Sequence, residues 1–351
     1  MSDRSTIAPT VTDGIRRLLD DAGITADADL VARILATGVG MGLDGADRLD
    51  LKITSAALTE MRAAFELFAP FRGVPKVTVF GSARTAPDSP LYRLTVELTA
   101  ALAARGWMTV TGAGPGIMQA AAEGAGPQHS LGVSIRLPFE EKPNAIIAAH
   151  ERNVAMKYFF TRKLMLVKES SGFVCMPGGF GTLDEMFELL TLQQTGKAVP
   201  TPIVLLDRPG GGFWQGLQRF VDDQLIPEGV ISPDDLDRVV VTDSVDAAVD
   251  ELTGFYRNYV SLRWVGRRLV LRLRVAPTDA DVDGLNARFG HLLAEGAIER
   301  RGPLKAERDD DDDLAAPRLV MRYAQRRVGE LHHLIRAVNA LPSAPAEARP
   351  A

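Results

Sequence analysis

The segment 172–188 constrains the fold most, because it combines a short apolar run, a glycine-rich turn and the start of a helix. The apolar run 173–176 is typical of a strand that is covered on both faces. The residues 177–181, three glycines and a proline among them, must end that strand in a sharp turn. Thr182 then occupies the expected helix N-cap, and Glu185 three residues later completes a capping-box pattern. A strand, a glycine turn and an open helix N-terminus together predict an anion site, and we expect this turn to hold a phosphate.

The same order of strand, turn and helix repeats through the middle of the chain. Short apolar runs alternate with longer helical patterns, which predicts βαβ units that close into a parallel sheet covered on both faces. The fold class is therefore α/β, a Rossmann-like doubly wound parallel sheet. Because each glycine turn follows a strand, the turns gather at the carboxyl ends of the strands, where open α/β sheets bind their ligands. The expected strands are 76–80, 108–111, 131–137, 173–176, 202–206 and 239–242, and the expected helices include 90–105, 117–124, 150–168, 213–225 and 245–259.

Changes of pattern divide the chain into three regions. Residues 1–72 have helical apolar spacing and predict an N-terminal helical appendage, before a central domain at 73–260. Residues 261–351 indicate a small α+β domain with the order βαββα and a disordered tail rich in proline and alanine. Within this last region we interpret the acidic run 309–313 as a solvated loop, with a metal or basic-partner site as the alternative.

Composition excludes several classes of protein. Of the 351 residues, 46% are hydrophobic and 24% are charged, as in an ordinary globular protein. The net charge of −5 argues against a nucleic-acid partner. The single cysteine excludes an internal disulfide framework. The sequence shows neither a long apolar stretch nor an apolar signal core, so we expect a cytoplasmic protein with no membrane partner.

The pair Arg162 and Lys163 lies in a helical stretch that is apolar on nearly all sides, so we expect this helix to be buried. A buried arginine needs a carboxylate or a phosphate beside it. Glu185 and the glycine turn lie at the sheet edge that can supply either group. For Glu185 a capping role and a role in the pocket both stay open at this point, and Glu188 is a weaker candidate one turn later.

Other residues carry weaker signals. The turn 112–116 follows a strand and opens a helix, but its glycine spacing is not that of a dinucleotide fingerprint. Together with Gly81 and Ser82, the glycine turns favour a nucleotide or a sugar phosphate. We interpret Cys175 as a buried structural thiol. The five histidines show no metal-ligand spacing, and we interpret the pair 332–333 as solvated.

The residues 177–185 spell Pro-Gly-Gly-x-Gly-Thr-x-x-Glu, and an Arg-Lys pair lies upstream in a helix. On this motif the chain resembles the LOG (Lonely Guy) family of nucleoside 5′-monophosphate phosphoribohydrolases, once labelled lysine-decarboxylase-like. The resemblance covers roughly residues 74–255 and leaves out both ends of the chain. The matching positions are Ser82, Gly112, Gly114, Gly116, Met118, Arg162, Lys163, Pro177, Gly178, Gly179, Gly181, Thr182 and Glu185.

The resemblance implies hydrolysis of the N-glycosidic bond of purine nucleoside 5′-monophosphates, AMP first, to free base and ribose 5-phosphate. It implies that Arg162 and Glu185 are the catalytic pair and that the turn 178–182 holds the 5′-phosphate. Met118 and the turn 112–116 would flank the nucleotide. No metal and no organic cofactor is implied, and members of the family form homodimers or larger homo-oligomers.

Three alternatives stay open. The chain could be specific for cytokinin nucleotides such as isopentenyl-AMP, or it could be a non-catalytic nucleotide sensor with the C-terminal domain as its output. Residues 159–161, before the Arg-Lys pair, depart from the Met and His of plant-like members and predict a changed pocket wall. The third alternative, a pyridoxal-phosphate-dependent lysine decarboxylase, is supported only by the former label of the family. No lysine stands out as a Schiff-base candidate.

Overall fold

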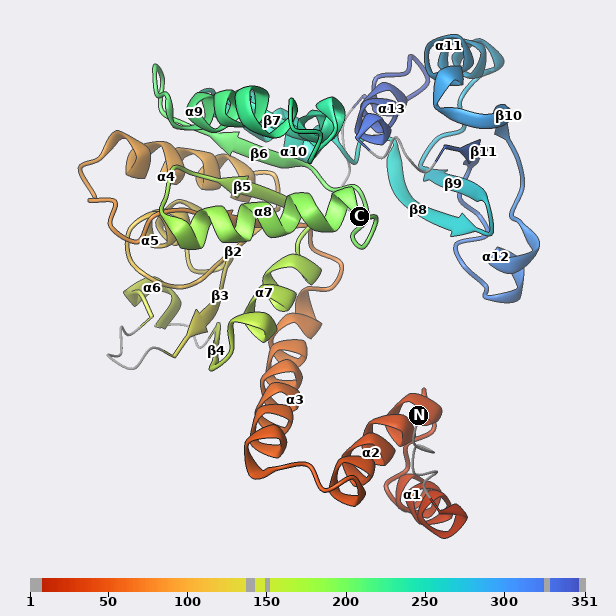
Figure 1. The fold of residues 1–351 in the computed structure, drawn as a ribbon. Coiled ribbons are helices and arrows are strands. Elements are labelled where there is room, and N and C mark those ends of the chain that lie inside the picture. The colour runs from red at the N-terminus through yellow and green to blue at the C-terminus, as the bar shows by residue number, and fades with distance from the viewer. Residues whose placement is uncertain (1–7, 137–142, 149–151, 325–328, 347–351) are drawn as a thin grey trace. The chain divides into compact units, whose positions relative to one another are not determined.

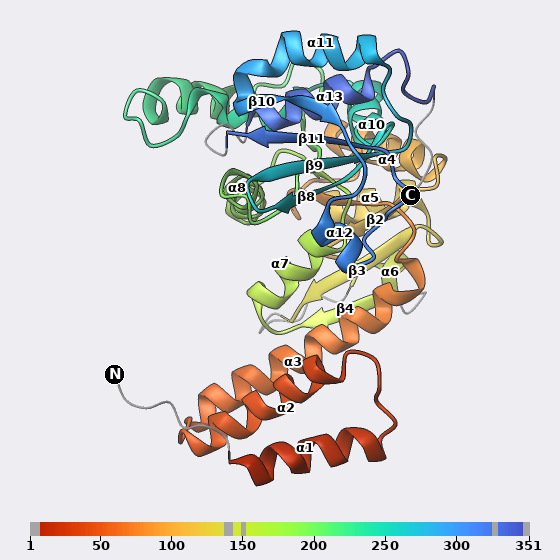
Figure 2. The ribbon, with the colours of Figure 1, turned by 90° about the vertical axis from the view of Figure 1, so that its right-hand side faces the viewer.

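The structure is a computed structural model of the chain, and it describes residues 8–136, 143–148, 152–324 and 329–346. The chain divides into two compact units, residues 1–62 and 63–351. Figures 1 and 2 show the elements of each unit in two views. No helix of the described ranges is both long and apolar enough to cross a membrane.

The first unit is helical, as predicted. It contains α1 (Pro9–Asp21), α2 (Ala28–Leu43) and most of α3 (Arg48–Phe68). Ile15 and Leu19 of α1 are buried, whereas α2 buries none of its residues.

The second unit contains the predicted parallel sheet, with seven strands in the order β4-β3-β2-β1-β5-β6-β7. The chain builds from β1 outward on one side and then returns to start the other side at β5, so the strand order reverses between β1 and β5. In doubly wound sheets the ligand crevice lies at such a switch point. The strands are β1 (Lys76–Phe80), β2 (Met108–Thr111), β3 (Ser130–Ile135), β4 (Asn153–Met156), β5 (Gly172–Cys175), β6 (Ile203–Leu206) and β7 (Val239–Thr242).

Helices cover both faces of this sheet (Figure 1). On one face the core contains Leu98, Leu102 and Val249 against Val77, Val174 and other strand residues, all of them buried. The helices are α4 (Pro90–Ala103), α5 (Ile117–Ala125), α6 (Ala145–Ala148), α7 (Phe159–Lys168), α8 (Phe180–Gln194), α9 (Phe213–Phe220) and α10 (Val245–Gly254).

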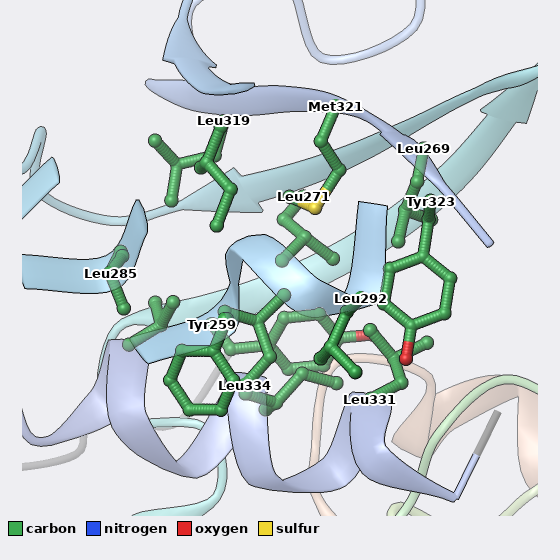
Figure 3. Packing of buried hydrophobic residues seen from close by; sticks show 14 of the residues in the cluster. Tyr259, Leu269, Leu271, Leu285, Leu292, Leu319, Met321, Tyr323, Leu331 and Leu334 are labelled. Carbon is green, nitrogen blue, oxygen red and sulfur yellow. The ribbon is translucent and has the colours of Figure 1, made fainter. Parts of the chain in front are cut away.

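The C-terminal part of the same unit is a second sheet, antiparallel, in the order β10-β11-β9-β8. Its helices α11 and α13 cover one face, and apolar side chains from both layers form a separate core (Figure 3). Arg336 of α13 binds Glu251 of α10 at 2.9 Å, which joins this part to the parallel sheet domain. The elements are β8 (Tyr259–Val265), β9 (Arg268–Leu273), α11 (Asp279–Phe289), β10 (Leu293–Arg300), α12 (Lys305–Asp309), β11 (Arg318–Tyr323) and α13 (Glu330–Asn339).

The structure corrects several expected elements. The helix predicted at 150–168 is wrong in its first half, because residues 153–156 form β4, which pairs with β3 at the sheet edge. The helix predicted at 245–259 ends at Gly254, and Tyr259 begins a strand, β8, that the expected βαββα order lacked. Helix periodicity alone cannot show that a short apolar run will find a strand partner.

Two polar predictions in the C-terminal part also change. His332 is buried, not solvated, and only His333 of that pair is exposed. The acidic run is largely exposed, yet its Asp310 pairs with Arg263, and Asp312 pairs with both Arg263 and Arg272. In the described part of the chain, no group of three His, Cys, Asp or Glu residues could hold a metal ion.

The predicted tail from residue 342 lies partly outside the described residues, from 347 on. Within the described part, Leu341 packs against the C-terminal core, and Ala344 N donates to the Leu341 carbonyl at 2.9 Å. The predicted domain boundaries at 72/73 and 260/261 stay predictions.

Candidate active site

A cleft of about 760 Å³ opens at the carboxyl ends of β1 and β5. The register explains its position, since Phe80 ends β1 opposite Cys175 at the end of β5. The turns that follow the two strands must therefore lie side by side at the switch point of the sheet. The cleft is lined by Val79, Phe80, Gly81, Ser82, Ala83, Arg84, Gly112, Met118, Arg162, Gly178, Gly179, Phe180, Gly181, Thr182, Leu183, Glu185 and Phe213.

Two glycines, Gly178 in the turn after β5 and Gly116 in the turn after β2, allow close approach to the turn after β1. A Cβ on Gly178 would lie 2.3 Å from Thr182 Oγ1 and 3.1 Å from the Ser82 amide nitrogen. Gly116 has a positive φ of 66°, and a Cβ there would lie 2.4 Å from the Ser82 carbonyl oxygen. Larger residues at these two positions would push the turns apart, so the glycines allow the three turns to pack closely beside the cleft.

Helix α8 begins in the cleft, and its start differs from the predicted capping box. Gly179 is the N-cap, no side chain caps the helix, and Thr182 is already its third residue. Glu185 therefore lies in the second turn, beyond capping reach, so the capping interpretation is wrong. The uncapped N–H groups and the helix dipole favour an anion at this end of the cleft.

Arg162 of α7 and Glu185 of α8 meet in the cleft. Arg162 Nη1 lies 3.6 Å from Glu185 Oε1, and the two side chains are only 12% and 14% exposed. Arg162 Nε donates to the Val133 carbonyl at 3.0 Å, which anchors the guanidinium to β3. A Cβ on Gly112 would lie 2.0 Å from Arg162 Nη2, so only glycine leaves room for this arrangement.

Burial shifts the pKa values of both groups toward their neutral forms. Desolvation raises the pKa of Glu185 to about 7, although Arg162 and Lys163 oppose the shift. Desolvation also lowers the pKa of Arg162, with Glu185 acting in the opposite direction. No hydrogen bond reaches the Glu185 carboxylate from any described residue. Only the charges of Arg162 and Lys163 therefore compensate for the loss of solvation of its ionised form. A carboxyl group with a pKa near neutrality is suited to exchange protons with a substrate or a water molecule.

Lys163 faces away from this pair. Its Nζ lies 2.7 Å from Asp184 and 2.8 Å from Glu188, both on α8. Burial opposes its charged form, but the hydrogen bonds to Asp184 and Glu188 prevail and raise the pKa of Lys163. These ion pairs clamp α7 to α8 and thereby fix the spacing of Arg162 and Glu185.

Most of the predicted site residues reach the cleft. Lys163, Pro177, Gly114 and Gly116 do not line it, and the two glycines pack instead against Met118 and the turn after β1. Residues 159–161 do not line it either, so they form no wall of the cleft as the structure describes it, contrary to the prediction. The predicted site residues that line the cleft are Ser82, Gly112, Met118, Arg162, Gly178, Gly179, Gly181, Thr182 and Glu185.

Among the lining residues that were not predicted, Arg84, Phe180 and Phe213 have large side chains that can contact a ligand. Arg84 is an exposed cation, and its position two residues after Ser82 could have indicated that it lies at the cleft. Phe180 is 93% exposed at the start of α8. Phe213 comes from α9, where its ring contacts Trp214, and no local sequence pattern indicates that it reaches the cleft.

The fold and the cleft define a Rossmann-like α/β protein with a glycine turn before an uncapped helix and a buried Arg–Glu pair at the switch point of its sheet. Comparison with known proteins agrees with this class. A family profile described as "Possible lysine decarboxylase" matches residues 116–252. The cytokinin riboside 5′-monophosphate phosphoribohydrolase of Mycobacterium tuberculosis is 33% identical over 165 residues, which cover 45% of this chain and 83% of that protein.

The enzyme of the same name from Mycobacterium marinum is 31% identical over 170 residues, covering 47% of this chain and 87% of that protein. The chain therefore belongs to the LOG family of phosphoribohydrolases. A solved structure of the molybdenum cofactor carrier protein from Chlamydomonas reinhardtii is similar at 20% identity, over 50% of this chain and 94% of that one, with a TM-score of 0.36.

Proposed function

We propose that this protein hydrolyses the N-glycosidic bond of purine nucleoside 5′-monophosphates, AMP first, to free base and ribose 5-phosphate. One observation carries the proposal: the buried Arg162–Glu185 pair shares a cleft with the uncapped N-terminus of α8. The names of the similar mycobacterial enzymes support the same reaction class.

The 5′-phosphate would bind at the glycine turn. The free amides at the start of α8 and the dipole of its 15 residues favour an anion there. Arg84 is exposed at the rim of the cleft, where its charge can reach a phosphate. Binding energy from this end would hold the distant glycosidic bond in position for reaction.

Glu185 would act at the ribose. As the C1′–N bond breaks, the sugar gains positive charge, which a nearby carboxylate stabilises. Glu185 can also take a proton from the water whose oxygen forms the new bond to C1′. The proton then passes to the departing base, so the water is divided between the two products. A pKa of about 7 allows both the acceptance and the release of this proton.

Arg162 would act at the base. Its guanidinium is held by the Val133 carbonyl and by Glu185, so it presents a fixed charge to the cleft. The leaving base accumulates negative charge as the bond breaks, and a fixed cation offsets that charge without reorganisation.

A substrate panel tests the proposal. AMP, GMP, CMP, UMP and isopentenyl-AMP are incubated separately with the full chain, and the released base is measured by chromatography. We expect release from AMP that is absent in Glu185→Gln. A large preference for isopentenyl-AMP would favour the cytokinin-specific alternative, which the names of the relatives support. AMP binding without release would favour the nucleotide sensor.

We further propose that the protein forms homo-oligomers through α7 and α8. These helices are clamped together by Lys163, and both expose large apolar side chains that monomeric proteins rarely leave open. Phe160→Ser should lower the mass measured by light scattering after size exclusion, whereas Val230→Ser, at another exposed apolar position, should leave it unchanged. An unchanged mass for Phe160→Ser would rule this surface out. The exposed residues are Phe159 (57%), Phe160 (55%), Leu164 (47%), Phe180 (93%) and Phe187 (40%).

A further inference from the structure

A second cavity, of about 560 Å³, lies between the C-terminal end of α8 and the antiparallel sheet domain. This volume is in the range of small-molecule sites. None of its lining residues lines the cleft that contains Glu185. We call it the junction cavity, and it is lined by residues 193–200, by Leu262, Arg263 and Trp264 of β8, by Tyr323 of β11, and by Leu331 and His332 of α13.

Two buried polar side chains in the wall of the junction cavity, Gln193 and His332, have atoms without a hydrogen-bond partner. Gln193 is 3% exposed; its Nε2 donates to the Thr201 carbonyl at 2.9 Å, but its Oε1 has no partner among the described residues. His332 is fully buried, and neither ring nitrogen makes a well-aligned hydrogen bond to a described residue, although the backbone of Thr201 lies close to the ring. Buried polar atoms without partners are uncommon, because each costs free energy that a bound molecule can restore.

The buried wall of the junction cavity presents uncharged hydrogen-bonding groups, whereas Lys197 lines the cavity at an exposed position. Burial lowers the pKa of His332 to about 3, and Arg336 and Arg238 act in the same direction, while the backbone of Thr201 opposes the shift. The imidazole is therefore neutral at physiological pH and offers one donor and one acceptor. The charge of Arg263 is already offset by Asp310 and Asp312. The buried wall, formed by Gln193 and His332, therefore favours an uncharged occupant with both a donor and an acceptor.

Aromatic rings supply a flat wall. Trp264 and Tyr323 meet edge to face, with ring centroids 6.4 Å apart and planes at 75°. Trp264 remains 38% exposed, whereas Tyr323 is buried. An indole face that is partly open to solvent is suited to stack against a planar ring.

We propose that the junction cavity binds an uncharged planar nitrogen heterocycle of the nucleobase class. Its ring would stack on Trp264, and its donor and acceptor edge would pair with Gln193 Oε1 and the His332 imidazole. The other occupant that these groups allow is ordered water, which would leave the site without affinity for any base.

The test uses the full chain with Arg162→Ala, a substitution that disables the proposed active site and leaves the junction cavity intact. Adenine, hypoxanthine, uracil and nicotinamide are titrated separately by calorimetry. Tryptophan fluorescence is followed in parallel, because Trp264 is the most exposed of the three tryptophans. We expect one of these bases to bind once per chain and to quench the emission.

Two variants of the junction cavity complete the test in the same Arg162→Ala background. Trp264→Ala removes the stacking surface at a partly exposed position, and we expect about tenfold weaker binding. His332→Phe keeps a ring but removes both nitrogens, and we expect a similar loss. Thermal melting checks that each variant is folded. Failure of all four bases to bind Arg162→Ala, or binding that folded Trp264→Ala retains in full, would overturn the proposal.

Discussion

Two buried Arg–Glu pairs in this protein have opposite electrostatic outcomes. In the cleft, Arg162 and Glu185 are 12% and 14% exposed, and in the antiparallel sheet domain Arg272 and Glu307 are 6% and 0% exposed. The pKa of Glu185 is raised to about 7, whereas the pKa of Glu307 is lowered. Similar exposure and the same pair of residue types therefore do not determine the charge state of the carboxyl group.

Hydrogen bonds account for the difference. Glu307 Oε1 accepts from Arg272 Nη2 at 2.8 Å and Nε at 3.2 Å, and its Oε2 accepts from the Leu304 amide at 3.0 Å. Arg318 adds a further charge at 3.5 Å. Glu185 has only Arg162 Nη1 at 3.6 Å. Burial opposes the charged form of Glu307 as well, but its hydrogen bonds and the two arginine charges together outweigh burial and lower its pKa.

The comparison separates a structural carboxylate from a reactive one. Glu307 is held by a saturated network that favours its charged form, and its removal should harm folding. Glu185 accepts no hydrogen bond from the described residues around the cleft, at a cost to stability, and its removal should harm chemistry. Four predictions test this distinction, and the largest effect comes first.

Glu185→Gln should lower kcat/KM for AMP by about 10³-fold, because the proposed general base is lost. The free energy of unfolding should stay the same or rise, since the variant no longer buries an ionisable group without hydrogen bonds. Steady-state kinetics and urea unfolding measure the two quantities. A folded, fully active variant would remove Glu185 from the mechanism.

Glu307→Gln should have the converse effect and destabilise the protein by about 3 kcal/mol, because Arg272 and Arg318 lose a buried counter-ion. The loss should shrink as the pH falls, since the lowered pKa of Glu307 provides stability above the unfolded-state value and loses it on protonation. Chemical unfolding at neutral and at acid pH measures this difference in the free energy of unfolding. A kcat/KM that falls as far as in Glu185→Gln, per folded molecule, would contradict the distinction.

Gly112→Ala should displace Arg162 and lower kcat/KM by about 10-fold to 100-fold. The added Cβ meets Arg162 Nη2 at 2.0 Å, the end of a flexible side chain, so the arginine can move while the fold survives. The matched control is Gly216→Ala in α9, where the nearest atom is 3.8 Å away and no loss is expected. Equal kinetics for the two variants would show that the position of Arg162 does not matter.

The pH dependence gives the smallest effect. If the carboxylate form of Glu185 acts, kcat/KM should be about tenfold lower at pH 6 than at pH 8, because the pKa of Glu185 is raised to about 7. Stability should change in the opposite sense: the contribution of Glu185 is fully present below its unfolded-state pKa and is lost as the pH rises through about 7. A flat activity profile between pH 5 and pH 8 would show that this group does not titrate in the rate-limiting step.

Local pattern predicted the strands of the parallel sheet well. Short apolar runs such as 173–176 and 202–206 match β5 and β6 to within one residue, because strands buried on both faces are largely apolar. The same logic failed at 153–156, where a strand at the sheet edge replaced part of a predicted helix. An edge strand has one neighbour and only partial burial, so its residues carry a weaker signal.

Predictions of polar function were less secure, because they depend on distant partners. Thr182 and Glu185 fit a capping box in sequence, yet the helix starts at Phe180 and frees Glu185 for the cleft. His332 looked solvated, but it is fully buried, and the ring of Phe255 lies 5.8 Å from its imidazole. The acidic run gained arginine partners from β8 and β9, which are about 40 residues distant in the chain.

The sequence by itself determined the residue types at the site and the turns that hold them, because glycine, proline and apolar periodicity act over a few neighbours. Only the tertiary structure decided what those residues face. The reversal of strand order between β1 and β5 brings the two turns together, and the packing of α7 against α8 places Arg162 beside Glu185. Burial and the number of hydrogen bonds then set each charge state, and both quantities arise from contacts between segments far apart in the chain.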